Sequence, residues 1–182
     1  MSAREKPRTA LVFGAARSGK SRYAERLALA TGLVPVYVAT AEARDEEMAA
    51  RIAAHKRMRA DAGWTSVEEP LALVETLQAS ASADTVLLVD CLTLWLSNLF
   101  EAGRDVEAEG ARLAAFLSAA PGAVVLVSNE VGAGIVPINA LARRFADAQG
   151  RLNQTVAAAA AHVFLVAAGQ PLRLKPAPEF TL

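Results

Sequence analysis

Eight residues near the amino terminus constrain the fold of this chain more than any other segment. They are Gly14, Ala15, Ala16, Arg17, Ser18, Gly19, Lys20 and Ser21. They match the pattern G-x-x-x-x-G-K-[ST], which follows a strand and opens a helix. Both flanks fit, because the apolar run Ala10 to Phe13 precedes the loop and the helical pattern Lys20 to Ala30 follows it. The sequence therefore predicts a strand, a phosphate-binding loop and a helix in direct succession.

The residue types in this loop suit the binding of a nucleoside triphosphate. Glycine permits tight backbone turns, so that successive N–H groups can converge on phosphate oxygens. The helix that follows adds the positive end of its dipole to the same anion. Lys20 would reach the β- and γ-phosphates, and the Ser21 hydroxyl would bind Mg²⁺. The alternative, a glycine turn before an ordinary helix, is disfavoured by four matching positions with correct flanks.

A second segment supports nucleotide binding. Val86 to Val89 form an apolar run that ends in the carboxylate of Asp90, the form of a Walker B element that organises magnesium. Aspartate is also a favoured helix N-cap. Asp90 could therefore bind the metal, cap the next helix or do both.

The rest of the chain alternates between short apolar runs and longer helical patterns, which is typical of a parallel sheet flanked by helices. The expected strands are Ala10 to Phe13, Val34 to Ala39, Val86 to Asp90, Val124 to Ser128 and Val163 to Val166, with a weaker one at Leu172 to Leu174. The expected helices are Lys20 to Ala30, Asp45 to Ala60, the stripe Leu92 to Phe100, and Ala140 to Ala161. We expect one α/β domain over residues 1–182, a P-loop NTPase with a RecA-like, mostly parallel sheet.

Composition narrows the class of function. The 182 residues contain 19 Lys and Arg and 19 Asp and Glu, without the basic excess typical of nucleic-acid-binding proteins. Cys91 is the single cysteine, which favours a reducing compartment. Met1 to Thr9 lack the apolar core of a signal peptide, and no apolar run approaches the ~20 residues of a membrane span. We expect a cytoplasmic enzyme with no nucleic-acid partner and no membrane span.

Two histidines are candidates for chemistry. His162 begins an apolar strand after an alanine-rich helix, and we interpret it as structural. His55 lies among Arg51, Lys56, Arg57 and Arg59. This segment is either a solvated basic helix end or a nucleophilic imidazole whose neighbouring cations hold phosphates. Nearby positive charge would lower the pKa of His55 and keep it neutral, as a nucleophile must be.

Further blocks follow the loop in a specific order. They are Tyr37 to Ala41, Asp45 to Ile52 leading to His55, Trp64 to Pro70, Val89 to Thr93, Ser128 to Gly132, Gly134 to Pro137 and Gly150 to Gln154. With the loop, this set resembles the bifunctional adenosylcobinamide kinase / adenosylcobinamide-phosphate guanylyltransferase family of cobalamin biosynthesis. The resemblance runs from about Ala10 to Lys175.

The resemblance implies two reactions. ATP or GTP phosphorylates the aminopropanol hydroxyl of adenosylcobinamide, and GMP then passes from GTP, through an enzyme histidine, to the phosphorylated corrinoid. His55 matches the guanylylated histidine, and Lys20 is catalytic in both steps. Other matches to the nucleotide site are Thr40, Ala41, Glu42, Lys56, Arg57, Met58, Arg59, Glu68 and Asp90, with Ser21 and Asp90 on the Mg²⁺ side. The resemblance also suggests a homo-oligomer, and specifically a trimer.

Two positions depart from the family pattern. Ile138 stands where a glutamate is common, and Ala133 replaces a bulkier side chain.

Two other functions remain open from the residues alone: a single-activity P-loop kinase in which His55 is structural, and a RecA-like ATPase or nucleotide-dependent regulator.

Overall fold

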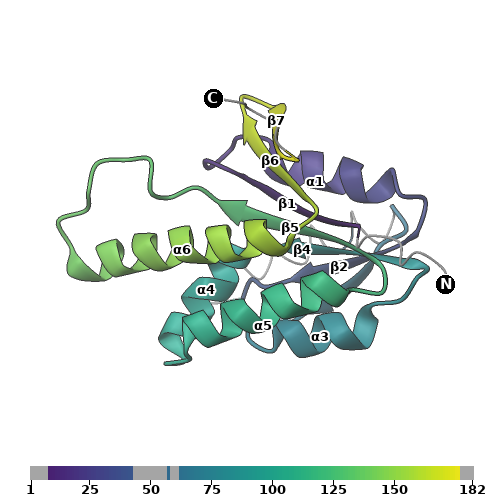
Figure 1. Cartoon of the computed structure of the whole chain (residues 1–182), viewed down its shortest axis with the longest axis horizontal. Helices are drawn as coiled ribbons and strands as arrows, with labels where there is room; N and C mark the ends of the chain where they lie inside the picture. Colours follow the sequence, from purple (N-terminus) through teal and green to yellow (C-terminus); the bar gives the residue numbers. More distant parts are fainter. Residues whose placement is uncertain (1–7, 43–56, 58–61, 177–182) are drawn as a thin grey trace, which may run out of the picture.

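The fold is built on a seven-stranded sheet. The computed structural model describes residues 8–42, 57 and 62–176. The strands are β1 (Thr9–Gly14), β2 (Val34–Ala39), β3 (Thr65–Glu68), β4 (Thr85–Asp90), β5 (Ala123–Asn129), β6 (His162–Ala167) and β7 (Gln170–Lys175). Their order across the sheet is β3-β2-β4-β5-β1-β6-β7. Every neighbouring pair is parallel except β6 and β7, which form an antiparallel hairpin at one edge (Figure 1).

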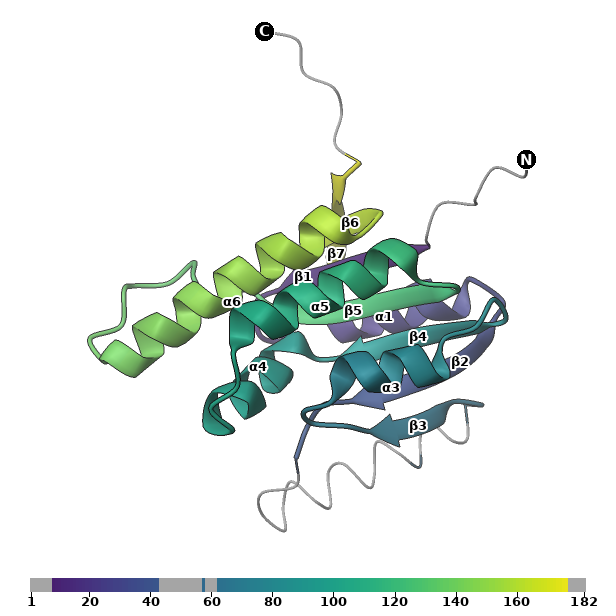
Figure 2. The ribbon, with the colours of Figure 1, turned by 60° about the horizontal axis from the view of Figure 1, so that its bottom comes forward.

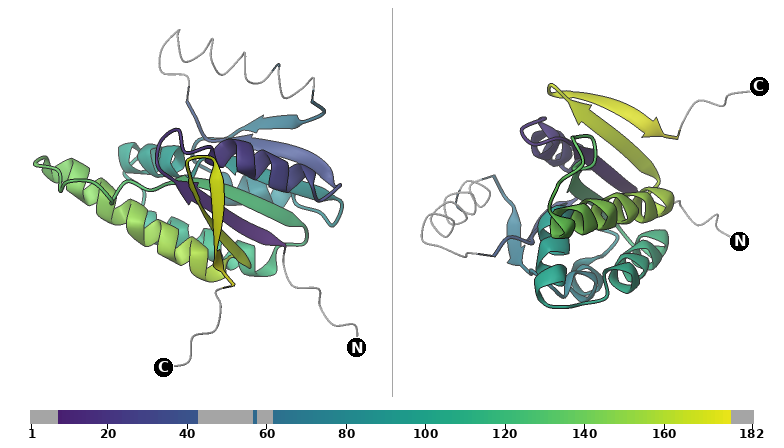
Figure 3. Two further views of the ribbon diagram at one scale, coloured as in Figure 1. Left: turned by 90° about the horizontal axis from the view of Figure 1, so that it is seen from above. Right: turned by 90° about the vertical axis from the view of Figure 1, so that its left-hand side faces the viewer.

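Helices cover both faces of this sheet. Those among the described residues are α1 (Lys20–Leu29), α3 (Leu73–Ser80), α4 (Leu92–Glu101), α5 (Val106–Ala119) and α6 (Ala140–Ala159). The views in Figure 3 show α1 on one face and the other four helices on the opposite face. None of these described helices combines the length and the apolar character that a bilayer crossing requires.

Side chains along the central strands point alternately to the two faces of the sheet, so the core consists of two layers. Val12 and Val127 point toward α1, together with Ala24 and Ala28 of that helix. The intervening residues, such as Leu126, pack against α3, α4, α5 and α6. Because both faces are covered, the strands are continuous apolar runs, as expected for a buried parallel sheet.

The sequence predicted all six apolar strands, and the structure confirms them to within two residues at each end. It missed β3, a short edge strand of sequence Thr-Ser-Val-Glu, and the helices α3 and α5. The helix expected at Ala140 to Ala161 ends at Ala159, because the chain turns there into β6. The helix expected at Asp45 to Ala60 lies outside the described residues, apart from the helical Arg57.

The loop between β5 and α6 extends away from the sheet together with the first turns of α6 (Figure 2). Its apolar side chains face solvent, with 98% of Ile135 and 98% of Ile138 exposed. Asn139 caps the helix, since its side chain accepts hydrogen bonds from the N–H groups of Leu141 and Ala142. Exposed apolar side chains that lie close together are typical of surfaces that contact another molecule.

Candidate nucleotide-binding site

The candidate site lies where the parallel strands end. Gly14 at the end of β1 is opposite Asn129 of β5, and Asp90 at the end of β4 is opposite Val127. On the other side of Asp90, Ala39 of β2 is its register partner. The sheet thus brings together segments far apart in sequence, and the carboxyl edge of an open parallel sheet is the usual location of a ligand site.

Two glycines of the loop are required by its geometry. A Cβ on Gly14 would lie 2.3 Å from the carbonyl oxygen of Val166, a distance that no side chain could occupy. Gly19 has φ of +93°, in the region that glycine alone adopts readily. Arg17 also has a positive φ, of 57°. The backbone therefore turns tightly before α1 begins at Lys20, as the sequence predicted.

The hairpin turn between β6 and β7 contacts the phosphate loop through a backbone hydrogen bond. The N–H of Gly169 donates to the carbonyl of Ser18 at 2.8 Å, and the Ser18 N–H donates to the carbonyl of Ala15 at 3.2 Å. Sequence reasoning missed this contact because Ser18 and Gly169 lie 151 positions apart. Its one signal was the Ala168-Gly169 pair after an apolar strand, which marks a turn but not what the turn touches.

Polar side chains of the loop remain available to a ligand. Lys20 is partly exposed, and its Nζ donates to the carbonyl oxygen of Ala15 at 3.2 Å. Ser21 is partly buried in the first turn of α1. The Oγ of Ser18 is buried and has no hydrogen-bond partner within the described part of the chain. These groups line the start of α1, where the helix dipole favours an anion.

Asp90 is oriented by Tyr37 of the neighbouring strand. The Tyr37 hydroxyl donates to Asp90 Oδ2 at 2.8 Å. The N-cap of α4 is Cys91, whose side chain makes no capping hydrogen bond, so the interpretation of Asp90 as a helix cap is wrong. Burial raises the pKa of the Cys91 thiol, Asp90 raises it further and Lys20 lowers it. Asp90 and Lys20 therefore both lie within electrostatic reach of Cys91.

Thr40 joins the end of β2 to the end of β4. Its buried hydroxyl donates to the carbonyl of Cys91 at 2.8 Å and accepts from the Cys91 N–H at 2.9 Å. Ala41 is partly buried and Glu42 is exposed beyond it, while Glu68 is exposed at the end of β3. Thr40 thus lies buried at the carboxyl edge of the sheet, where it fixes the backbone of Cys91. Glu42 and Glu68 are exposed.

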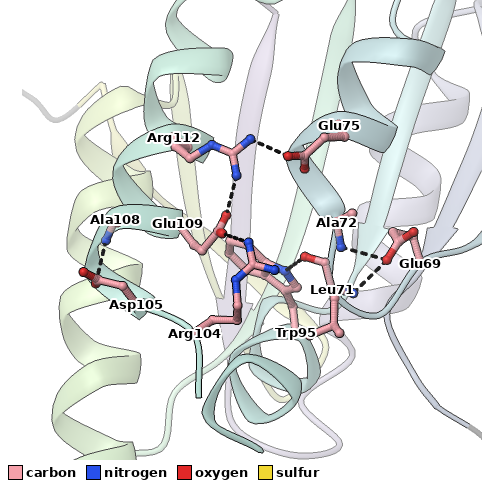
Figure 4. A network of polar contacts seen from close by, with 10 residues as sticks. All are labelled: Glu69, Leu71, Ala72, Glu75, Trp95, Arg104, Asp105, Ala108, Glu109 and Arg112. Carbon is pink, nitrogen blue, oxygen red and sulfur yellow. Dashed lines mark hydrogen bonds and ion pairs between the residues drawn. The ribbon is translucent and has the colours of Figure 1, made fainter. Parts of the chain in front are cut away.

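A buried asparagine in α4 binds the segments that follow β2 and β3. Asn98 Nδ2 donates to the carbonyl of Thr40 at 2.8 Å and to that of Pro70 at 3.1 Å. Nearby, Trp95 Nε1 donates to the carbonyl of Leu71 at 3.0 Å (Figure 4). The sequence showed α4 as an apolar stripe, and Asn98 within it carried no signal of the carbonyls that it binds.

Several predicted site residues cannot be located in this structure. His55, Lys56, Met58 and Arg59 lie outside the described residues, and Arg57 is helical and exposed. His162 begins β6 and is the register partner of Ala10, so it lies at the end of β1 that is farther from the loop. It is exposed, and its ring stacks on Phe164 with centroids 6.4 Å apart.

The described residues fit a magnesium ion held jointly with a nucleotide. The Ser21 hydroxyl and the Asp90 carboxylate supply oxygen donors, and Oδ1 of Asp90 makes no hydrogen bond within the described ranges. No cluster of three or more His, Cys, Asp or Glu occurs among the described residues. Magnesium is commonly held by one or two protein oxygens together with phosphates and water, and not by a protein cage.

The fold and the loop define a P-loop nucleotide-binding protein. Solved structures with the same arrangement include the RadB recombinase, with a TM-score of 0.52 and 17% identity over 88% of this chain and 74% of that one. A KaiC-like protein from Pyrococcus horikoshii has a TM-score of 0.50 and 15% identity over 88% of this chain and 72% of that one. At such identities the likeness concerns the fold alone.

Sequence comparison specifies the family within this class. Residues 10–174 match the family of cobinamide kinase / cobinamide phosphate guanyltransferase, and the chain belongs to this family. The bifunctional adenosylcobalamin biosynthesis protein CobP of Pseudomonas aeruginosa is 49% identical over 92% of this chain and 98% of its own length. The bifunctional adenosylcobalamin biosynthesis protein CobU of Escherichia coli is 42% identical over 91% of this chain and 98% of its own. The family resemblance expected from the ordered blocks is confirmed.

Proposed function

We propose that this chain, acting as one catalytic domain, performs two successive reactions on one corrinoid. In the first, ATP or GTP phosphorylates the aminopropanol hydroxyl of adenosylcobinamide. In the second, GTP supplies GMP to the phosphorylated product and gives adenosylcobinamide-GDP. The observation that carries the proposal is a complete phosphate loop beside Asp90, in a chain whose family is named for both activities.

The phosphate loop serves both reactions in this proposal. Backbone N–H groups of residues 14–21 and the Lys20 ammonium bind the nucleotide phosphates, because phosphoryl transfer depends mainly on positioning and on charge stabilisation. The second part of the nucleotide site comprises Thr40, Ala41, Glu42, Lys56, Arg57, Met58, Arg59 and Glu68. Thr40 would act through the backbone, since its hydroxyl is bound to Cys91.

Magnesium completes the phosphate site, held by Ser21 and Asp90. When bound, it neutralises charge on the phosphates. Tyr37 fixes the Asp90 carboxylate by its hydrogen bond to Oδ2, so that Oδ1 is directed by the protein before nucleotide arrives.

Guanylyl transfer requires a nucleophile, and we assign that role to His55. A ring nitrogen attacks the α-phosphorus of GTP, a P–N bond forms, and the Pα–O bond to the departing pyrophosphate breaks. A phosphate oxygen of the corrinoid then attacks the same phosphorus, and the P–N bond breaks. Histidine can form such covalent intermediates.

Labelling with GTP that carries ³²P at the α-phosphate tests this assignment. The wild type should retain an acid-labile, alkali-stable label, and chelation of magnesium should abolish it. His55→Ala should lose the label and the guanylyl transfer while it still phosphorylates adenosylcobinamide. His162→Ala is the matched control and should label normally. A label that persists in His55→Ala, or an adduct that resists acid as a phosphate ester of a hydroxyl side chain does, would falsify the histidine mechanism.

The same experiment separates the proposal from the simpler functions. A single-activity kinase would phosphorylate adenosylcobinamide without any label, and a nucleotide-dependent regulator would do neither. Mass analysis of the product after turnover with adenosylcobinamide and GTP decides between one step and two. We further propose that the active form is a homo-oligomer, namely a trimer.

A further inference from the structure

The last residue of β5, Asn129, is fixed by two helices. Its N–H donates to Thr93 Oγ1 of α4 at 2.9 Å, and its carbonyl accepts from Asn153 Nδ2 of α6 at 3.1 Å. The next residue, Glu130, donates its N–H to the carbonyl of Gly14 at 3.0 Å. Strand ends are ordinarily free to fray, but here both backbone polar groups of Asn129 are bound by side chains.

A buried network behind Asn129 holds Asn153 in turn. Oδ1 of Asn153 accepts from the Ser128 hydroxyl at 2.6 Å and from Gln149 Nε2 at 3.1 Å. Gln149 Nε2 also donates to Ser128 Oγ at 3.0 Å. All three side chains are buried. Gln149 Oε1 is buried without a hydrogen-bond partner among the described residues, but both polar groups of the Asn153 amide are bound. The Asn153 amide therefore holds a fixed position under the end of β5.

Alternation along β5 places the Asn129 side chain on the same face as the phosphate loop. Val125 and Val127 pack toward α1, and Ser128 points to the other face, where it meets α6. Asn129 follows Val127 by two residues and therefore lies on the α1 side. By the same argument Asp90 lies on that side, because Leu88 packs toward α1.

The register then sets the height of Asn129. Asn129 is the register partner of Gly14, and Asp90 is the register partner of Val127, two residues earlier in β5. Along the strand direction Asn129 therefore lies about 6.6 Å beyond Asp90, at roughly 3.3 Å per residue. β5 runs between β4, which carries Asp90, and β1, which carries the loop (Figure 1). Asn129 thus lies between the loop and Asp90, and because it is partly exposed, its amide can reach a ligand bound there.

We propose that Asn129 is a catalytic residue of the kinase step, whose amide donates a hydrogen bond to the terminal phosphate of the nucleotide held by residues 14–21. Thr93 and Asn153 are positioning residues that act through its backbone. The inference rests on the proposed function. It introduces no covalent step, because the amide makes only a hydrogen bond. A preorganised neutral donor suits this place, because charge gathers on the oxygens of the transferred group and no reorganisation is then needed.

The test uses the full chain with magnesium, ATP and adenosylcobinamide. Asn129→Ala should lower kcat by about 100-fold, the size expected for one preorganised donor. Its affinity for the non-hydrolysable triphosphate AMP-PNP should fall about fivefold to tenfold relative to its affinity for ADP, which lacks the terminal phosphate. Asn129 does not titrate, so the pH profile of kcat should keep its shape. Gln154→Ala, on the exposed side of α6, is the control and should match the wild type.

Asn153→Asp keeps the shape and the acceptor of Asn153 but removes the donor to Asn129. It should lower kcat less than Asn129→Ala does, and the double variant should lose no more than Asn129→Ala alone, because coupled residues are not additive. Either a kcat of Asn129→Ala within threefold of wild type, or an unchanged ratio of AMP-PNP to ADP affinity, overturns the proposal. If the wild type fails to phosphorylate adenosylcobinamide, the proposed function fails, while the binding ratio still decides the role of Asn129.

Discussion

Lys20 carries the charge that both proposed reactions share. Replacing it with alanine removes the ammonium from the phosphates in both steps, and we expect kinase and guanylyltransferase activities to fall together by at least about 100-fold. The fold should persist, because Lys20 is partly exposed and its side chain makes one hydrogen bond within the described part of the chain, to the carbonyl of Ala15.

Parallel assays of the two activities, with an unfolding curve for Lys20→Ala, check this expectation. Survival of one activity near the wild-type level would show that the two reactions use separate phosphate sites.

Individual residues of the site differ in how far sequence could predict them. Gly14 and Gly19 were predictable because the constraint on each is local, a close approach or a positive φ. Asp90 was predictable as a carboxylate at a strand end, but its hydrogen bond from Tyr37 joins residues 53 positions apart. Asn129 was visible in a family-like block without any role, since its backbone partners come from two helices distant in sequence.

Among the elements, the strands were the most predictable. Each of the central ones is buried on both faces and is therefore a continuous apolar run. β3 was missed because it lies at the sheet edge and its four residues are partly or fully exposed. α3 and α5 pack on the sheet through one apolar side each, and no cap or motif drew attention to them except Asp105, which caps α5.

An ion-pair network joins α3 to α5 and gives a pH prediction (Figure 4). Arg112 of α5 donates to Glu75 of α3 and to Glu109. The hydrogen bond from Arg112 lowers the pKa of Glu75, helped by a backbone hydrogen bond. A lowered folded-state pKa stabilises the protein above the ordinary glutamate pKa, about 4.3, and this contribution disappears as the pH falls through the folded value.

Glu75→Gln should therefore lower the urea midpoint slightly at pH 7, and the difference from wild type should be smaller at pH 3, below the ordinary glutamate pKa of about 4.3. The effect is small because both side chains are about half exposed, 43% for Arg112 and 53% for Glu75. Gln78→Ala on the same helix serves as a control with no change at either pH. A difference of equal size at both pH values would mean that packing, and not charge, is responsible.

At the scale of the whole molecule, the exposed loop before α6 predicts assembly. Ile135 and Ile138 are apolar and almost fully exposed, and we expect a second copy of the chain to cover them. Changing both to serine should shift the protein to a smaller species in sedimentation velocity at micromolar concentration, with the helical content unchanged. A monomeric wild type, or a variant of unaltered size, would contradict this assignment.

The position of β1 has a consequence for the order in which the molecule is made. Residues 9–14 are synthesised before every other described strand, yet their neighbours in the sheet are β5 and β6. A nascent chain that ends before Ala123 already contains every residue of the phosphate loop but neither strand that holds β1 in place. Such long-range pairing forms slowly and late. The ability to bind a triphosphate therefore arises only after β5 and β6 have both been synthesised.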